Sequence, residues 1–463
     1  MTDLFGVLNI GTSALLFQQR AINVTGNNIA NVNTPGYSRQ RLNIETGLPV
    51  DTGSGLIGTG VRSAGIERVY DRFLGVQLNE ENANLGRWEA QQSMLERAEA
   101  VFDESEGYGL NQALSNFWDS WQDLTLNPSG QTERSVAAAT SQTLADTIRQ
   151  RYAELEQAQE NIDASVEGAV DDINRLTAEI ADLNQKIAST ERTGVNANDY
   201  RDSRDQALKE LSGIIAVNSY EDAEGQVAVS VGSGKPLVES GTTWQLSVQT
   251  NADGHTDIVW PNLNGGMVNI TGEITAGKVG GWLQARDTKI EGYQNDLDAL
   301  AQALMDEVNT LHAAGYGLDG TTGTDLFTGT GAVDMTLNPD ILNDPNLIAA
   351  STALGGIPGN ADNAIAINAL RTRLTMNGAT TTFDDAANTL VSRIGYDVQA
   401  AKASASNQAD MMTYLENYRE SVSGVSLDEE MVNLVKFQAA YDAAAKMISM
   451  ADEMLDSLMS IVG

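Results

Sequence analysis

The sequence predicts an elongated, multidomain chain that is mainly α-helical and carries β insertions. Two observations support this fold class. Apolar residues recur at alternating steps of three and four near both ends and through the middle of the first half, which is typical of amphipathic helices. Between residues 218 and 275 the period changes to two, which is typical of β-strands. We therefore expect long helices interrupted by a small β unit.

The N-terminal helix is predicted over residues 3–31. Its apolar side chains follow a heptad spacing, with seam residues at Leu8, Leu15, Ile22 and Ile29. The helix must end at Pro35 and Gly36, because proline removes a backbone donor and glycine permits a turn. Residues 37–70 are rich in Gly, Val, Ile and Thr and are expected to form short strands.

The middle of the chain is dominated by one long helical pattern. A helix at 71–106 and a short aromatic helix precede it. From 148 to 187 the seam stays apolar except at Gln159, which predicts a coiled coil over 132–190. At the helical rise per residue this rod would be about 90 Å long.

The second half of the chain alternates between β and helical patterns. After the β unit at 218–275, an apolar helical stripe returns at 279–308, and a Gly/Thr-rich loop follows it. Further helices are expected at about 362–376 and 383–421. The β unit is therefore inserted between helices.

The last helix is predicted to begin at Ser426 and to run to the C-terminus. Ser426 can accept from the backbone amide of Glu429, whose carboxylate can return a bond, so the two residues form a candidate helix cap. The helix carries a second heptad seam at Leu427, Met431, Leu434, Tyr441, Ile448 and Leu455.

Composition excludes several function classes. The 63 acidic and 28 basic residues give a formal charge of −35, which repels phosphate backbones and anionic lipids, so neither nucleic acid nor a membrane is an expected partner. The absence of cysteine excludes disulfides, thiolate metal sites and cysteine nucleophiles. No apolar stretch approaches the roughly 20 residues of a membrane-spanning helix, and no cleaved secretory signal is expected.

The histidines and glycine-rich loops carry no predicted chemistry. His255 and His312 are the only histidines, and a surface or packing role is expected for each. The Gly232–Lys235 segment lacks the spacing of a phosphate loop and is expected to be a hairpin turn. No catalytic, cofactor or metal residue is therefore predicted, and no cofactor is expected.

The segment 26–37 is similar to the N-terminal signature shared by flagellar rod, hook and hook-associated proteins. It carries a cluster of polar and turn residues, namely Asn27, Asn28, Asn31, Asn33, Pro35, Gly36 and Tyr37. The continuation at 38–40, the C-terminal segments 424–430, 438–441 and 451–455, and interior segments at 198–208, 280–287 and 309–316 resemble the hook-filament junction proteins of that family. The resemblance thins at about 328–345, where many members carry an additional outer β domain.

The resemblance implies a structural, non-enzymatic component of the bacterial flagellum. It implies secretion through the type III export apparatus, with an export chaperone on the C-terminal region. It further implies a homo-oligomeric adaptor ring between the hook protein and the second hook-associated (junction) protein, needed for filament attachment and motility. The alternatives are a hook or distal-rod subunit and, from another class, a cell-wall or glycan-processing enzyme of the apparatus.

The domain division follows from these patterns. We expect an inner coiled-coil domain that comprises residues 1–34 and 426–463. A middle helical rod domain with a β segment would comprise 35–217, 276–314 and 343–425. An outer β domain would comprise 218–275 and 315–342.

Periodicity alone leaves open that the terminal heptads are core helices of a globular bundle. The matched signatures at both ends favour assembly instead. Because the two terminal helices are about 400 residues apart and their seams have polar interruptions, their pairing should be marginal in one chain. We expect the termini to be disordered in the monomer and helical in the assembly, with the asparagines of the signature hydrogen-bonding across subunits.

Overall fold

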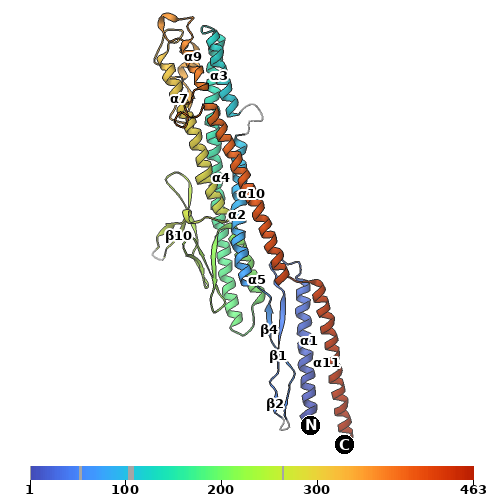
Figure 1. The fold of residues 1–463 in the computed structure, drawn as a ribbon. Coiled ribbons are helices and arrows are strands. Elements are labelled where there is room, and N and C mark those ends of the chain that lie inside the picture. Colours follow the sequence, from blue (N-terminus) through green and yellow to red (C-terminus); the bar gives the residue numbers. More distant parts are fainter. Residues whose placement is uncertain (1, 52–54, 103–108, 263–264, 463) are drawn as a thin grey trace.

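The computed structural model describes residues 2–51, 55–102, 109–262 and 265–462. These residues form a long rod of helices with a pair of terminal helices extending from one end (Figure 1). A β unit lies against the rod about halfway along it, and the two chain ends lie together at the far tip of the terminal pair. The chain is therefore elongated and mostly helical, as predicted.

The long helices lie close to the predicted ranges, whereas the helices at 198–214 and 339–343 were not predicted. They are α1 (Thr2–Ala30), α2 (Arg72–Val101), α3 (Leu110–Leu126), α4 (Gln131–Glu191), α5 (Asn198–Ile214), α6 (Gly277–Gln284), α7 (Glu291–Ala314), α8 (Pro339–Asn343), α9 (Asp362–Asn368), α10 (Phe383–Ser423) and α11 (Leu427–Val462). Short turns are η1 (Thr271–Glu273), the π-helical η2 (Ala285–Ile290), η3 (Pro345–Leu347), η4 (Leu354–Gly356) and η5 (Ala369–Thr372). No described helix is both long and apolar enough to cross a membrane.

The strands form small antiparallel sheets. The first group is β1 (Gln40–Thr46), β2 (Val50–Asp51), β3 (Leu56–Ile57) and β4 (Val61–Arg68), in which β1 pairs with β4 and β2 with β3. The β unit contains β5 (Val217–Glu221), β6 (Val227–Val231), β7 (Lys235–Glu239) and β8 (Thr242–Thr243) in one sheet, and β9 (Ser247–Thr250), β10 (Thr256–Pro261) and β11 (Met267–Asn269) in another, ordered β11-β10-β9. β12 (Phe327–Thr328) pairs with β13 (Thr336–Leu337).

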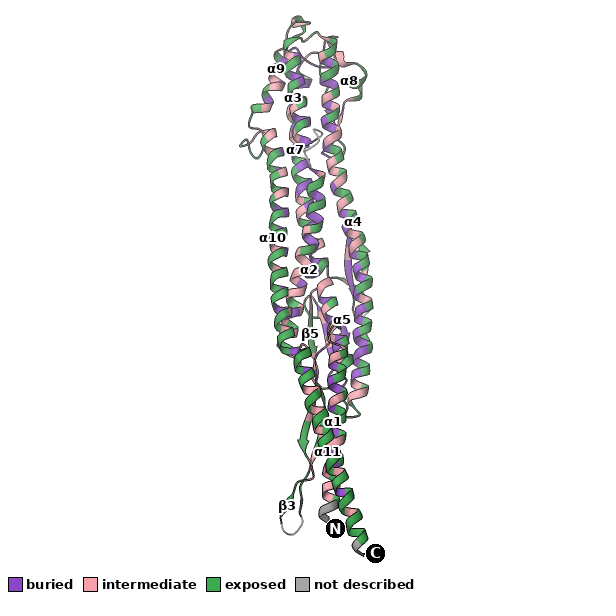
Figure 2. Ribbon diagram, turned by 90° about the vertical axis from the view of Figure 1, so that its right-hand side faces the viewer, coloured by how far each residue is buried: buried purple, intermediate pink, exposed green. Residues whose placement is uncertain are grey.

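The rod has a continuous core beside α4. The predicted apolar stripe of α4 is buried, apart from the half-buried Tyr152 (Figure 2). The polar interruption at Gln159 is also buried, and its amide donates to the backbone carbonyl of Arg286 in η2 at 3.2 Å. Because η2 is a π-helical turn, its carbonyls are displaced from regular α-helical bonding. Gln159 therefore satisfies a backbone acceptor inside the core.

An aromatic cluster fills the end of the rod that is remote from the termini. Trp118 and Trp121 are fully buried beside Phe117. His312 is also fully buried: its Nδ1 lies 2.6 Å from the carbonyl of Thr324 and its Nε2 accepts from a backbone amide. Burial lowers the pKa of His312 to about 4, so this histidine packs as a neutral side chain.

Two expectations need correction. The helix expected at 362–376 is shorter, because the chain leaves α9 through η5 and becomes extended at Arg373. The segment 315–342, which was grouped with the β unit, packs instead at the aromatic end of the rod, where Phe327 contacts Phe117 with ring centroids 5.9 Å apart. The predicted end of the 71–106 helix lies outside the described residues.

Candidate assembly site at the elbow between rod and terminal helices

Both terminal helices meet the rod at one place, which we call the elbow: residues 26–40, 423–430, β4 and α5. α1 and α11 lie side by side beyond it (Figure 1). The chain leaves α1 through a turn in which Gly36 has φ of +78°. A Cβ at that position would lie 3.1 Å from the Gln206 side chain on α5, so both conformation and space favour glycine.

Asn28 is the centre of the elbow. Its side chain is 1% exposed and makes bonds through both of its polar atoms. The amide nitrogen donates to the Gln40 carbonyl (2.9 Å) and to the Glu430 carboxylate (3.1 Å). The amide oxygen accepts from the Tyr37 hydroxyl and from the Gln40 backbone amide, both at 2.9 Å. One buried side chain thus joins α1, β1 and α11.

Glu430 completes the link to α11. It is 2% exposed, and its carboxylate accepts from Arg39 Nε at 2.8 Å as well as from Asn28. The backbone amide of Arg39 donates to the Ser423 carbonyl at 2.9 Å. Because a buried carboxylate is costly without partners, these bonds fix where α11 begins relative to β1.

The predicted cap at the start of α11 is placed beside this link. Ser426 accepts from the backbone amide of Glu429 at 3.5 Å, a long bond. The Glu429 carboxylate accepts from Arg39 Nη1 at 2.9 Å. The Glu429 carboxylate, which was expected to return a bond to Ser426, therefore binds Arg39, the residue that directly precedes β1.

A row of aspartates on α5 anchors the elbow to the rod. Asp202 accepts from the Ser38 backbone amide (3.0 Å) and from Arg68 on β4 (2.8 Å), and Asp205 accepts from the same guanidinium at 2.6 Å. Asp199 accepts from the side-chain amide of Gln40 at 2.7 Å. Burial raises the pKa of Asp202, although these donors oppose the shift.

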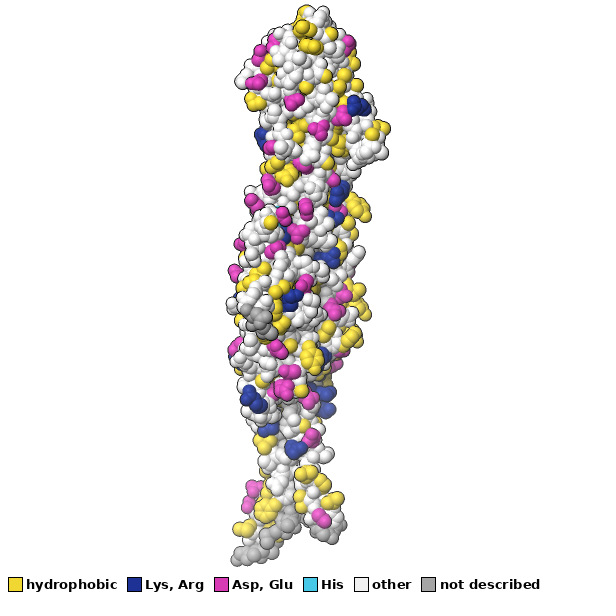
Figure 3. Space-filling view, turned by 90° about the vertical axis from the view of Figure 1, so that its left-hand side faces the viewer, with side chains coloured by type: hydrophobic (Ala, Val, Ile, Leu, Met, Phe, Trp, Pro, Cys, Tyr) yellow, Lys and Arg dark blue, Asp and Glu magenta, His cyan; other side chains and the backbone are white. Residues whose placement is uncertain are grey.

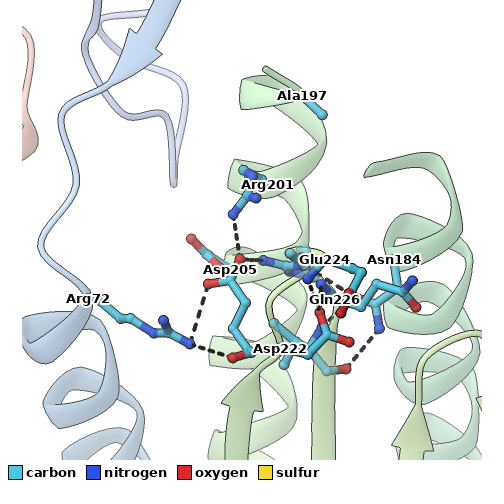
Figure 4. A network of polar contacts seen from close by, with 12 residues as sticks. Arg72, Asn184, Ala197, Arg201, Asp205, Asp222, Glu224 and Gln226 are labelled. Atoms are coloured by element: carbon cyan, nitrogen blue, oxygen red, sulfur yellow. Dashed lines mark hydrogen bonds and ion pairs between the residues drawn. The ribbon is translucent and has the colours of Figure 1, made fainter. Parts of the chain in front are cut away.

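A second polar network holds α5 itself in place (Figure 4). Arg201 donates to Glu191 at the end of α4 at 2.7 Å. Arg204, which is 1% exposed, donates to Asn184 (3.1 Å) and to the Gly225 carbonyl (2.7 Å) in the β5–β6 turn. The helix α5, which carries the three aspartates, is therefore held by polar contacts to α4 and to the β unit.

Comparison with known proteins finds sequence relatives that cover the whole chain. A family model described as the flagellar hook-associated protein FlgK helical domain matches residues 95–327. Models of the flagella basal body rod protein and of the flagellar basal body rod FlgEFG protein C-terminal match residues 8–37 and 416–461. Flagellar hook-associated protein 1 of Bacillus subtilis is 30% identical over 100% of this chain and 99% of its own length. This chain belongs to the flagellar hook-associated protein 1 family.

Other relatives agree with that membership. Flagellar hook-associated protein 1 of Escherichia coli is 25% identical over 98% of this chain and 99% of its own length. The fold is similar to the flagellar hook junction protein FlgK from Burkholderia pseudomallei, with a TM-score of 0.68, 17% identity, and coverage of 75% of this chain and 100% of that chain.

The signature residues of this family member lie at or beside the elbow but differ in their contacts. Asn28 and Tyr37 belong to the buried network, whereas Asn31 bonds locally, donating to the Asn27 carbonyl at 3.0 Å and to its side chain at 2.9 Å. Asn33 and Pro35 are exposed. Within one chain, Asn28 and not Asn31 is therefore the joining residue.

The predicted seams lie beside the lines that are buried within one chain. On α1, Leu8, Leu15, Ile22 and Ile29 are half-buried, while the buried line is Phe17, Ala21, Val24, Thr25 and Asn28. On α11, Leu434, Ile448 and Leu455 are half-buried and Leu427, Met431 and Tyr441 are exposed, while the buried residues are Glu430, Ala444 and Ala451. The predicted seam of α11, which includes Met431, therefore lies one residue away from the buried line, which includes Glu430.

Sequence reasoning missed Arg39, Glu430 and the aspartates as elbow residues. A signal was present, because Asp199, Asp202 and Asp205 recur every three residues and therefore lie along one face of a helix. The partner Arg68 comes from a strand more than 130 residues away, and no local pattern identifies it.

Proposed function

We propose that this chain is a structural subunit of the bacterial flagellum that acts as the adaptor at the hook-filament junction and is needed for filament attachment and motility. The observation that carries the proposal is the elbow: the two ends of the chain, each matching a flagellar rod model, are joined there to a helical rod that matches the hook-associated family. Its function resides in surfaces, and no enzymatic role is proposed.

The terminal helices act as an incomplete coiled coil that neighbouring subunits complete. α11 exposes large apolar side chains along its length, namely Leu427, Met431, Val432, Val435, Met447, Met450, Met454, Leu458 and Met459. Figure 3 shows apolar side chains at the surface of this narrow end, while acidic side chains are spread along the rod. Because exposed apolar patches mark interaction sites and the −35 charge opposes association, apolar contacts must drive assembly.

The partners follow from this surface and from the family. The subunits form a homo-oligomeric ring between the hook protein and the second hook-associated protein. The chain is secreted by type III export, and a chaperone covers the methionine-rich face of α11 before assembly. Methionine suits such a surface because its flexible side chain adapts to different partners.

A hook or distal-rod subunit is the alternative that a specific observation favours, because both terminal models are named for rod proteins. The helical-domain match over 95–327 favours the junction instead. The two are distinguished in cells that lack their own junction subunit: such cells should carry hooks without filaments, and this chain should restore filaments. Restoration of hooks or rods in cells that lack those subunits would contradict the junction role.

Substitutions in α11 test the assembly surface. Met431 is 60% exposed, so Met431→Asp should leave the monomer folded and remove filament attachment. Ile448 lies against Gly11 of α1, where a Cβ would be 2.8 Å from Ile448 Cγ1, so Ile448→Asp should also separate α1 from α11. Leu434→Asp should behave like Ile448→Asp. Normal filament attachment by the Met431→Asp chain would contradict the proposed role of this face.

A further inference from the structure

The helices α10 and α4 form opposite edges of the rod (Figure 2). Their exposed surfaces differ in charge. Between residues 386 and 409 of α10 the only acidic residue is Asp397, which is buried and accepts from Lys289 at 2.7 Å and from Tyr293 at 2.8 Å. The exposed charged residues of that stretch are Arg393, which pairs with Asp296, and Lys402. In a chain of charge −35, this stretch of α10 therefore has no exposed carboxylate of its own, although the exposed Asp296 of α7 and Glu99 of α2 lie beside its upper part at Arg393 and Gly395.

The α4 edge has the opposite character. Exposed carboxylates recur along it at Glu156, Glu160, Glu167, Asp171, Asp172, Glu179 and Asp182. The nearby cations Arg175 and Lys186 are already paired within α4. The edge also contains Gly168 in the middle of a helix, where a Cβ would meet nothing within 4 Å. Glycine costs roughly 0.5–1 kcal/mol relative to alanine inside a helix, and no contact within the chain requires it.

The two surfaces lie at the same level along the rod. α4 and α10 both begin at the end of the rod that is remote from the termini (Figure 1). The η2 turn spans the space between them, because Arg286 bonds to Asp163 on α4 while Lys289 bonds to Asp397 on α10. Counting from those two aspartates, Gly168 lies about 7.5 Å and Ala403 about 9 Å towards the elbow.

We propose that α10 of one subunit packs against α4 of the next subunit, through the stretch around Ala403 and the stretch around Gly168. This inference rests on the proposed function, because it assigns the faces that join subunits of the ring. Two different faces on opposite edges make a head-to-tail contact, which is the kind that closes a ring. Contacts between two α4 edges would bring carboxylates together, whereas α10 around Ala403 offers Lys402 and no exposed carboxylate of its own.

A charge-swap experiment in cells that lack their own junction subunit tests the pairing. Ala403→Glu keeps a good helix former and places a carboxylate on the α10 edge. It should reduce filament attachment on the order of tenfold, since like charges facing each other across an interface are strongly unfavourable. Adding Asp171→Lys to the same chain should restore attachment. Ala299→Glu, the same change at an exposed site of α7, is the matched control and should have no effect.

Cross-linking gives a second, independent readout. The chain has no cysteine, so Gly168→Cys with Ala403→Cys introduces the only thiols. A short bis-maleimide should link chains into a ladder of multimers in assembled flagella and leave purified monomer unlinked, and each single variant should give no ladder beyond dimers. If the unsubstituted chain restores filaments but the ladder is absent, or the thiols link a different protein, this inference is overturned and the junction function stands. Failure of the unsubstituted chain to restore filaments overturns the proposed function itself.

Discussion

The rod and the terminal helix pair differ in how much of their apolar surface they bury. In the rod, Trp118, Trp121 and the apolar stripe of α4 are buried. In the terminal pair and the elbow, Asn28, Thr25 and Glu430 are among the buried residues, while methionines and valines of α11 remain exposed. The rod thus contains the core that stabilises it. The terminal pair buries fewer apolar side chains, is fixed to the rod by the polar bonds of the elbow, and leaves many apolar side chains of α11 exposed.

This difference predicts that substitutions separate into two classes. Those in the rod should change the free energy of unfolding of the isolated subunit, because buried apolar surface stabilises the monomer. Those in the terminal pair should change assembly, because much of their apolar surface is still exposed in the monomer. Limited proteolysis of the monomer should therefore cut α1 and α11 first, and resistant termini would contradict the comparison.

Trp118→Ala should have the largest effect on the isolated subunit. The side chain is fully buried, contacts the Phe117 ring edge-to-face and the tilted Phe383 ring, and donates from Nε1 to Asp384 at 3.3 Å. Truncation should cost about 3–5 kcal/mol in the free energy of unfolding, measured by chemical denaturation. Phe73, which is 80% exposed on α2, supplies the control, because Phe73→Ala should change stability little. Equal losses in the two variants would show that burial does not distinguish the sites.

His312 should make the rod sensitive to acid. Burial lowers its pKa to about 4 in the folded chain from 6.5, so between these pH values the unfolded chain binds the additional proton. Stability should therefore fall as the pH drops from 6.5 towards 4, by about 3 kcal/mol in total. The measurement is the free energy of unfolding at pH 7.5 and at pH 5.

The His312→Gln variant isolates this contribution, since other carboxylates also titrate in acid. It should lose stability at pH 7.5 but show a smaller difference between the two pH values. A parent-like pH dependence in His312→Gln would assign the acid sensitivity to other groups.

The sequence predicted the helices better than it predicted their contacts. The ends of α1 and α4 follow from Pro35, Gly36 and the apolar period, because these signals are local. The predicted line of contact on α11 differs from the buried line by one residue, because a glutamate such as Glu430 is expected at the surface. It is buried because Arg39 and Asn28, 391 and 402 residues away in the sequence, bind its carboxylate. Such partners have no local signature.

Asn28→Ala should weaken the elbow without affecting the rod. It removes an acceptor from Tyr37 and a donor from the buried Glu430, and leaving such groups unpaired costs about 1–3 kcal/mol. Faster hydrogen exchange in α1 and β1, with an unchanged melting temperature of the rod, is the expected result. Asn27→Ala, at an exposed neighbouring residue, is the control. Unchanged exchange in Asn28→Ala would remove this residue from the centre of the elbow.

Asn31→Ala should have the smallest effect on the isolated chain. Its side chain bonds only across one helical turn to Asn27 and accepts from Thr34 at 3.1 Å, so its loss should cost no more than about 1 kcal/mol. Hydrogen exchange at the elbow should then remain close to that of the parent. If filament attachment nevertheless falls with Asn31→Ala, the side chain acts between subunits, as the sequence suggested; if attachment is normal, the joining role belongs to Asn28 alone.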